Sequence, residues 1–429
     1  QAVFDYYGVQ RVSDMDELAT ALVMFAQPHE AASGGLVCLH DSGGERQLII
    51  DLADGLKVPL TEVEESTTAQ LSEMLDPGLP AVNPLDAWGA GGPNASATMA
   101  SCFSILLTDS GAAMGAVVHD RGPNSEIYSS YLDYLEKAQR ASGKPVFLVA
   151  NRQGSGADEL AISSTYQGLP VIDGVTQFLV GARCLLAYRD FQQRAVMKCD
   201  VTDQQKVDYW KRQLQDCDYV SESLASELLR DFGIPMIQSL EVSSLDELQT
   251  AVLNVGFPLV LKTAVQGIDH KTEVGGVILN ISDQPQLQDA YEDLLQRLGP
   301  AVTVAPMADN NGVEMILGVS RDEQFGPTVV VGFGGIYAEI LSDVAVMLPP
   351  FDSAEVKRVL KSLSMYPLLE GVRGGSPLDI DSYCDVAAKM SAIALALSDS
   401  VVEIDINPVR LGVKGCIGLD ALVVQEQKN

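Results

Sequence analysis

Lysines, a histidine and glycines gather in residues 258–279, PLVLKTAVQGIDHKTEVGGVIL. Lys262 closes an apolar run that is typical of a strand, so its ammonium can reach an anion while the strand stays buried. The loop that follows carries His270 and Lys271 and then Gly275-Gly276. Glycines let backbone N–H groups approach phosphate oxygens closely. A lone lysine at a strand end is usually a surface residue, so only the combination indicates a phosphate site.

A nucleotide base and its sugar could be held by residues 302–343. The apolar stretch from Val304 to Met307 could lie along the edge of an adenine, which its backbone N–H and C=O groups would read. Glu314 follows one segment later, in reach of ribose hydroxyls. Acids near a helix start often only form a solvated first turn, so these acids indicate a nucleotide site only together with the lysines. The other candidates are a glycine pair and two acids at i, i+4 spacing: Gly334, Gly335, Glu339 and Asp343.

Three oxygen-bearing side chains near the end of the sequence suit a divalent cation. Asp405 and Asn407 project from the same face of a predicted strand because strand side chains alternate with period two. Asp420 follows across a predicted hairpin around Gly415. Mg²⁺ prefers hard oxygen ligands, takes few of them from the protein, and completes its shell with phosphate and water. These residues therefore predict a magnesium site.

The elements that must position these residues form two patterns. Between residues 33 and 195, short apolar runs such as GLVCLH and KPVFLVA alternate with amphipathic helices, which indicates parallel βαβ units and a flavodoxin-like sheet. Residues 196–220 are polar and predict a linker that contains a helix. Residues 221–425 hold closely spaced strand-like runs, which favour an antiparallel sheet. Residues 1–32 are interpreted as the end of an upstream domain.

The composition restricts the partners of the chain. Its 429 residues include 28 basic and 58 acidic side chains, a formal net charge of −30. Nucleic acid and anionic membranes are bound through Lys and Arg, so we expect neither as a partner. No stretch approaches the ~18 uninterrupted apolar residues of a membrane span. The seven cysteines are scattered without a CxxC pair, which predicts reduced thiols and a cytoplasmic location.

Three motifs in this order, HKTEVGG, GFGG with AEILSD, and EIDINPV, resemble the ATP-grasp domain of the NDP-forming acyl-CoA synthetases. The resemblance covers residues 215–425 and implies an α/β protein: a flavodoxin-like domain followed by a two-lobed ATP-grasp (α+β) domain that binds ATP, or GTP, with Mg²⁺. By position, Lys262 resembles the phosphate-binding lysine, and His270 matches a histidine proposed as a second phosphate carrier. Glu314 resembles the acid on the ribose side. Asn407 and Asp420 match the Mg²⁺ ligands, with Asp405 in support. Arg373 is a weaker match to a nucleotide contact.

The N-terminal half extends the resemblance through LHDSGGERQLIIDLADG. In these enzymes a glycine-headed helix points its N-terminus at a phosphohistidine. Ser42, Gly43 and Gly44 would supply the free N–H groups, and the helix dipole would add about half a positive charge. The alternative is that the glycines only turn a strand into a helix. The segment VNPLDAWGAGG matches an NPxD segment that lies near the phosphohistidine and the acyl site in the family.

The resemblance also implies parts that this sequence lacks. The principal phosphohistidine of the family lies in an SHTG motif just upstream of a segment like AVFDYYGVQRV, and the CoA-binding domain would also be upstream. We therefore expect CoA to be bound mainly by an upstream domain or subunit. The implied function is an ADP-forming acyl-CoA synthetase that activates a small carboxylic acid through a phosphohistidine relay. We expect a homo-oligomer.

The acyl group and the outcome of the reaction stay open. Trp88, beside Asp86, could stack on an aromatic acid, as in feruloyl-CoA synthetases, or hold a sulfonium cation, as in the ATP-dependent dimethylsulfoniopropionate lyases that resemble this family. Glu126 is then a candidate base. Trp88 could equally be a core residue. A different class, the non-catalytic ATP-grasp module of protein acetyltransferases, is disfavoured because the phosphate and metal residues are intact.

Overall fold

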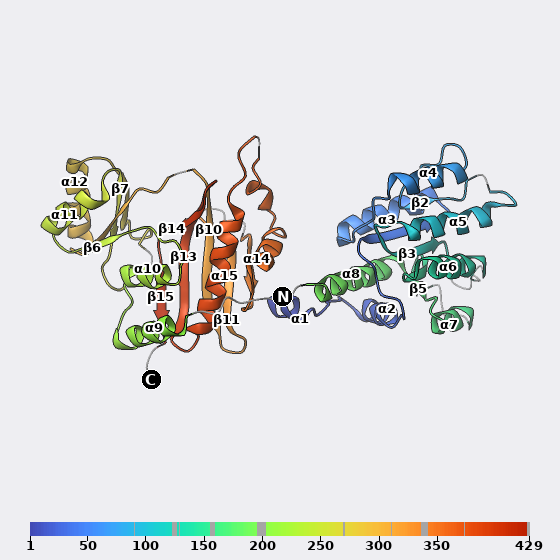
Figure 1. The fold of residues 1–429 in the computed structure, drawn as a ribbon, viewed down its shortest axis with the longest axis horizontal. Coiled ribbons are helices and arrows are strands. Elements are labelled where there is room, and N and C mark those ends of the chain that lie inside the picture. The colour runs from blue at the N-terminus through green and yellow to red at the C-terminus, as the bar shows by residue number, and fades with distance from the viewer. Residues whose placement is uncertain are drawn as a thin grey trace. The chain divides into compact units, whose positions relative to one another are not determined.

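The structure is a computed structural model and describes residues 1–89, 91–121, 127, 129–154, 159–194, 203–268, 271–309, 311–335, 342–372 and 374–426. Four residues singled out from the sequence lie outside these ranges: Glu126, His270, Glu339 and Arg373. The chain divides into two compact units, Tyr7–Ala195 and Gln1–Tyr6 with Val196–Asn429. Figure 1 shows the helices and strands of both units.

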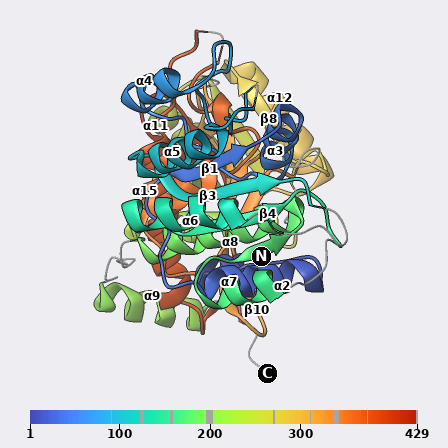
Figure 2. The same ribbon diagram turned by 90° about the vertical axis from the view of Figure 1, so that its right-hand side faces the viewer.

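The first unit is built on a parallel sheet. Its strand order is β2-β1-β3-β4-β5, and every pairing is parallel. This is the flavodoxin order, so the predicted flavodoxin-like fold is confirmed. Figure 2 shows β1, β3 and β4 side by side. The strands are β1 (Gly35–His40), β2 (Leu85–Asp86), β3 (Ala112–His119), β4 (Val146–Ala150) and β5 (Val171–Asp173).

Helices cover both faces of this sheet because its central strands are apolar on both sides. Every residue of β1, β3 and β4 is buried. One face packs against α4, α5 and α6 around Phe103 and Leu135, and the other packs against α2, α3 and α8 around Met24 and Phe178. α2 lies so close to α8 that a Cβ at Gly181 would be 2.3 Å from the Met24 sulfur. The helices are α2 (Met15–Phe25), α3 (Gly43–Leu56), α4 (Glu65–Met74), α5 (Ala95–Thr108), α6 (Ser129–Ser142), α7 (Glu159–Tyr166) and α8 (Val175–Gln192).

The second unit contains a large antiparallel sheet of order β12-β11-β10-β13-β14, with β15 also paired to β13. Helix α15 lies along this sheet in Figure 1. Tyr383 of α15 is buried, and its hydroxyl donates to the Ile316 carbonyl of β10 at 2.5 Å. The strands are β10 (Val313–Asp322), β11 (Gly326–Phe333), β12 (Val344–Met347), β13 (Val401–Leu411), β14 (Cys416–Gly418) and β15 (Leu422–Gln425).

A smaller antiparallel sheet of order β6-β9-β7-β8 forms a separate lobe with α11 and α12. Its core, around Leu261 and Leu287, shares no residue with the core of the larger sheet, around Phe333 and Tyr383. The predicted two-lobed α+β domain is therefore confirmed. The strands are β6 (Leu240–Val242), β7 (Leu259–Thr263), β8 (Val277–Ile281) and β9 (Val302–Pro306).

Helix α9 comes from the predicted linker and packs into the larger lobe. Val207, Trp210 and Leu214 are buried in its core, and Trp210 Nε1 donates to Asp231 Oδ2 at 2.9 Å. Among the described residues no helix is both long and apolar enough to cross a membrane. The helices of the second unit are α1 (Ala2–Tyr7), α9 (Gln204–Asp216), α10 (Glu222–Asp231), α11 (Leu245–Val255), α12 (Gln284–Arg297), α14 (Ser353–Leu360), the 3-10 helix η1 (Tyr366–Leu368) and α15 (Ile380–Ala396).

Candidate active site

The two lysines predicted to bind phosphate meet at one place. Lys262 lies in β7, where all five residues are buried, and its Nζ donates to the Leu419 carbonyl at 2.8 Å and to Asp420 Oδ2 at 2.9 Å. Lys271 lies in the loop before β8, with its Nζ 3.1 Å from Asp420 Oδ1. Both ammonium groups also contact Glu222, Lys262 at 3.2 Å and Lys271 at 2.6 Å.

The two carboxylates come from the larger lobe, whereas the two lysines come from the smaller one. Asp420 lies between β14 and β15. Glu222 is the first residue of α10, whose N-cap Ser221 accepts a hydrogen bond from the Leu224 N–H. Leu228, in the core of the larger lobe, anchors the helix there. Lys262, Lys271, Glu222 and Asp420 thus form one cluster, which we name the lysine–carboxylate quartet.

Burial and charge oppose each other in the quartet, whose side chains are between 8% and 28% exposed. Burial raises the pKa of Asp420, but the neighbouring Lys262 and Lys271 ammonium groups outweigh it and hold the pKa below its ordinary value. Burial also acts to lower the pKa of Lys271, but the Asp420 and Glu222 carboxylates outweigh it and raise that pKa. Asp420 and Lys271 are therefore both ionised at neutral pH.

A cavity of about 390 Å³ opens beside the quartet, and the residues that line it include Glu222, Lys271, Asp405, Asn407 and Asp420. Asp405 and Asn407 face this cavity from β13, whereas the residues on either side of Asp405 are buried in the core. The alternation expected from the sequence is thus present. The structure brings all three predicted metal ligands to the cavity that also holds a predicted phosphate lysine.

The donor set of this cavity suits Mg²⁺. Asp405, Asn407 and Asp420 offer carboxylate and amide oxygens, the hard ligands that this ion prefers. Across the described ranges no three or more His, Cys, Asp or Glu side chains are grouped so as to hold a metal by themselves. Asp420 contacts both lysines, so it would have to share or exchange these contacts to bind the ion.

Glu314 is held in a fixed position by three neighbours. Its Oε1 accepts a hydrogen bond from Arg410 Nη2 at 2.8 Å. Its backbone carbonyl accepts from the Gly334 N–H at 2.8 Å. Gly335 has φ +58°, and a Cβ there would lie 2.2 Å from Glu314 Oε2. The structure therefore brings together Glu314, Gly334 and Gly335, and the absence of a side chain at 335 makes room for the carboxylate.

The stretch predicted to read a base divides into two parts. Val304 is buried in β9 and has sheet neighbours on both sides, Leu240 in β6 and Leu261 in β7. Its backbone groups are used by the sheet, which is a physical reason against base reading at Val304. Met307 follows the strand, and its N–H donates to the Pro258 carbonyl at 2.9 Å.

In the first unit, the N-terminus of α3 opens into a cavity of about 600 Å³ that Ser42, Gly43, Asp86 and Trp88 line. Ser42 is the N-cap residue, and its side chain makes no capping hydrogen bond within the described structure. Gly44 is the second residue of the helix. Trp88 is 43% exposed, so it is not a core residue. The structure thus places Trp88 beside two of the three residues predicted to hold a phosphoryl group.

A carboxyl pair stands behind this helix end. Burial, and then the charge and hydrogen bond of Asp41, raise the pKa of Glu45 to about 7. Tyr131 donates to Asp41 Oδ2 at 2.6 Å, and Asn151 Nδ2 donates to Glu45 Oε1. The shared burial makes it costly for both carboxyls to be charged together. Glu45 is therefore partly protonated near neutral pH.

The two histidines at the carboxyl ends of β1 and β3 are poor phosphate acceptors. His40 and His119 are buried, and within the described residues neither ring nitrogen of either has a hydrogen-bond partner. Burial lowers the pKa of His40 to about 3 and that of His119 to about 4. Both rings are neutral and enclosed.

Comparisons with known proteins identify the second unit. The sequence model of the ATP-grasp domain family matches residues 213–424. The β subunit of the ADP-forming acetate–CoA ligase I of Pyrococcus furiosus is 33% identical over 213 residues, which are 47% of this chain and 90% of that subunit. This chain belongs to the ADP-forming acyl-CoA synthetase family.

Relatives in this family also match the first unit. The ADP-forming acetate–CoA ligase I of Archaeoglobus fulgidus is 27% identical over 437 residues, covering 99% of this chain and 61% of that ligase. A trans-feruloyl-CoA synthase of an unknown prokaryotic organism is 28% identical, covering 98% and 60%. The chain thus spans about three fifths of the length of these relatives. All three relatives are ligases or a synthase, which gives the lyase alternative no support.

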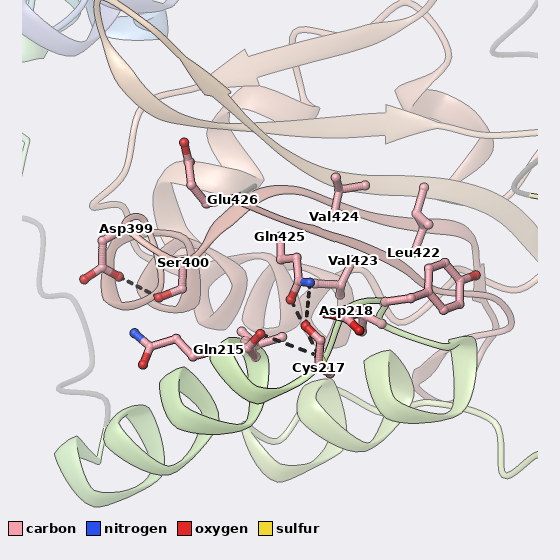
Figure 3. A pocket seen from close by; sticks show the side chains of 13 residues that line it. Gln215, Cys217, Asp218, Asp399, Ser400, Leu422, Val423, Val424, Gln425 and Glu426 are labelled. Atoms are coloured by element: carbon pink, nitrogen blue, oxygen red, sulfur yellow. Dashed lines mark hydrogen bonds between the residues drawn. The ribbon is translucent and has the colours of Figure 1, made fainter. Parts of the chain in front are cut away.

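A second cavity of this chain, about 670 Å³, lies beside β15 and is shown in Figure 3. Among its lining residues, Gln425 Nε2 donates to the Cys217 carbonyl at 2.8 Å. The charged residues among the described side chains that line it are all acidic: Asp218, Asp399 and Glu426. No lysine or arginine is among its described lining residues, whereas Lys271 lines the cavity beside the quartet.

Two residues of the candidate site were missed from the sequence. Glu222 stands 40 residues before Lys262 and looks like an ordinary acid in a first helical turn. Arg410 lies three residues after Asn407 on the same strand, but only the sheet pairing shows that it faces Glu314. An acid directly after a helix N-cap and an arginine beside the metal motif were the available signals.

Proposed function

We propose that this chain supplies the nucleotide-binding and phosphoryl-transfer part of an ADP-forming acyl-CoA synthetase. Such an enzyme joins a small carboxylic acid to coenzyme A while ATP is converted to ADP and phosphate. One observation carries the proposal: Lys271, Asp405, Asn407 and Asp420 line a single cavity, and Lys262 contacts one of them. Cationic side chains and hard oxygen donors in one hollow are what a metal–polyphosphate complex requires.

The proposed reaction is a relay of three displacements. The lone pair of a histidine ring nitrogen attacks the γ-phosphorus of ATP, so an N–P bond forms and the P–O bond to ADP breaks. An oxygen of the carboxylic acid then attacks the same phosphorus, giving an acyl phosphate and restoring the histidine. The sulfur of CoA attacks the acyl carbon, a thioester forms, and phosphate leaves with the thiol proton. Each step needs charge stabilisation on phosphoryl oxygens.

The residues of the chain have separate parts in this proposal. Lys262 and Lys271 neutralise phosphate oxygens, and Glu314 holds the ribose. Asp405, Asn407 and Asp420 would hold Mg²⁺, which screens the charge of the phosphates when bound. In the first unit, Ser42, Gly43 and Gly44 would receive the phosphoryl group at the N-terminus of α3. His270 stays the proposed second phosphate carrier.

The acyl site and the partners belong to the same proposal. Trp88 would contact the acyl group, and Glu126 stays a predicted base. The Pyrococcus furiosus relative is one subunit of a ligase, which supports a partner domain or subunit that binds most of the CoA. The described cysteines are all free, which fits the cytoplasm as the place of action. Self-association into a homo-oligomer stays a prediction.

Phosphoryl transfer to His270 tests the proposal with this chain alone. The chain and its matched variant His270→Ala are each incubated with Mg²⁺ and with ATP that carries a label in the γ-phosphate. We expect a label that is stable in base, lost in acid and absent from the variant. ATP that binds without any label would contradict the relay and favour a non-catalytic ATP-grasp module. For the acyl group, ADP release with acetate and with ferulate is compared on the enzyme complete with its CoA-binding part.

A further inference from the structure

Glu222 bridges the two phosphate lysines in the way that a phosphate group would. Its Oε1 lies 3.2 Å from Lys262 Nζ, and its Oε2 lies 2.6 Å from Lys271 Nζ. Each oxygen therefore takes a different ammonium group. A phosphoryl group offers the same arrangement, with separate oxygens that each accept from one donor.

The bridge connects the two lobes of the ATP-grasp domain. Glu222 is anchored on the larger lobe through α10, whereas Lys262 and Lys271 belong to the smaller sheet. Separate hydrophobic cores hold the two partners. The contacts between them can therefore exchange without disturbing either core.

The charge balance explains why such a carboxylate is present. The Glu222 side chain is 8% exposed and that of Lys262 is 10% exposed, so these charges must be paired. Two ammonium groups and two carboxylates cancel in the quartet. Asp420 also has the cavity with Asp405 and Asn407 before it, where it is a proposed metal ligand. Glu222 lines the same cavity but is not among the predicted metal ligands, and a fixed carboxylate between the two phosphate lysines would repel an incoming phosphate.

We infer that Glu222 is a positioning residue that takes the place of a phosphate between Lys262 and Lys271 when the site holds no nucleotide, and that it gives up these contacts to the nucleotide. The inference rests on the proposed nucleotide-binding function and adds a device to it. In this arrangement Glu222 holds both lysines in place until the phosphates displace it.

The test is the affinity for Mg·ATP and Mg·ADP, measured by titration calorimetry on the wild-type chain, Glu222→Gln and Glu241→Gln. Glu241 lines the same cavity from β6, and it pairs with neither lysine within the described residues, so it is the matched control for a lost charge. We expect Glu222→Gln to bind roughly tenfold tighter, because one charge-assisted hydrogen-bond competitor is gone. Glu241→Gln should stay within about twofold, the size of a screened surface charge.

Thermal unfolding gives a second readout that does not depend on turnover. Without nucleotide, Glu222→Gln should unfold at a lower temperature than wild type, because two buried lysines then share one carboxylate. The rise in its unfolding temperature on adding Mg·ATP should exceed the rise seen in wild type. Glu222→Asp, which keeps the charge but is too short to span both lysines, should fall between the two.

The outcomes separate the inference from the function beneath it. Weaker binding in Glu222→Gln, or binding equal to that of Glu241→Gln, would overturn the inference and make Glu222 a permanent anchor or a bystander. If Glu222→Gln does not fold, an unchanged affinity in Glu222→Asp overturns it as well. A wild-type chain that binds no nucleotide would instead refute the proposed function.

Discussion

Nζ of Lys262 lies 2.9 Å from Oδ2 of Asp420, and the two residues belong to different lobes. The lysine extends from a fully buried strand, and its ammonium also donates to the Leu419 carbonyl at 2.8 Å. The predicted phosphate lysine is thus tied to a predicted metal ligand. A substitution at either residue should therefore change both the free energy of unfolding and the binding of nucleotide.

Lys262→Met should destabilise the chain by about 3 kcal/mol, because it leaves Glu222 and Asp420 close together with a single ammonium between them. The methionine keeps the apolar stem, so the loss reports the charge. The free energy of unfolding is measured with urea. Nucleotide binding by the variant should fall below detection.

Lys211→Met is the control for that experiment. Lys211 pairs with Asp399 at 2.8 Å on the surface of the same unit, where Asp399 is 64% exposed. An exposed pair of this kind contributes about 0.5 kcal/mol. Equal losses in the two variants would show that the quartet is no stronger than a surface ion pair.

The stability of the chain should also fall with rising pH because of Glu45. Its pKa is about 7 in the folded chain, against an ordinary value of 4.5. Between these values the unfolded chain has already lost the proton that the folded chain keeps, so unfolding becomes easier as the pH rises. Comparing thermal unfolding of wild type with Glu45→Gln, we expect the variant to gain about 1 kcal/mol over wild type between pH 5 and pH 8, after allowance for partial exposure. Parallel pH curves would contradict the assignment.

Much of the fold was predictable because local patterns decide it. The apolar runs that became β1, β3 and β4 are buried on both faces, and such runs separated by helices can only form a parallel sheet with helical layers. Asp405 and Asn407 were predictable as a pair for the same kind of reason, since strand alternation is a local rule.

Contacts between distant segments were not predictable. Glu222 meets Lys271 across 49 residues and Arg410 meets Glu314 across 96, and no local rule selects these partners. The stretch predicted to read a base shows a second limit of sequence patterns. Apolar residues such as Val304 fit a binding edge and a central strand equally well, and only the sheet pairing places Val304 between two strands.

Arg410 should act on the nucleotide through Glu314. Arg410→Met removes the donor that holds Glu314 Oε1 at 2.8 Å and leaves the carboxylate free to rotate. We expect the affinity for ATP to fall about tenfold, the size of one charge-assisted hydrogen bond. The double variant with Glu314→Gln should bind no more weakly than Glu314→Gln alone, because the two residues act as one unit. Additive losses in this cycle would contradict the coupling.

Gly335 should be intolerant of a side chain for two separable reasons. Its φ of +58° disfavours any L residue, and a Cβ there would lie 2.2 Å from Glu314 Oε2. Gly335→Ala should therefore lose about 1 kcal/mol of stability from backbone strain and should also push the Glu314 carboxylate out of place. Stability is measured with urea, and ATP affinity by calorimetry.

Gly415→Ala separates these two effects. Gly415 has φ +80°, but a Cβ there would meet no atom within 4 Å. This variant should lose a similar amount of stability, about 1 kcal/mol, and keep the ATP affinity of wild type. Gly335→Ala should bind ATP several-fold more weakly at the same loss of stability. If both variants bind ATP equally well, the glycine at 335 serves only the turn, and Glu314 does not need its present position to bind the nucleotide.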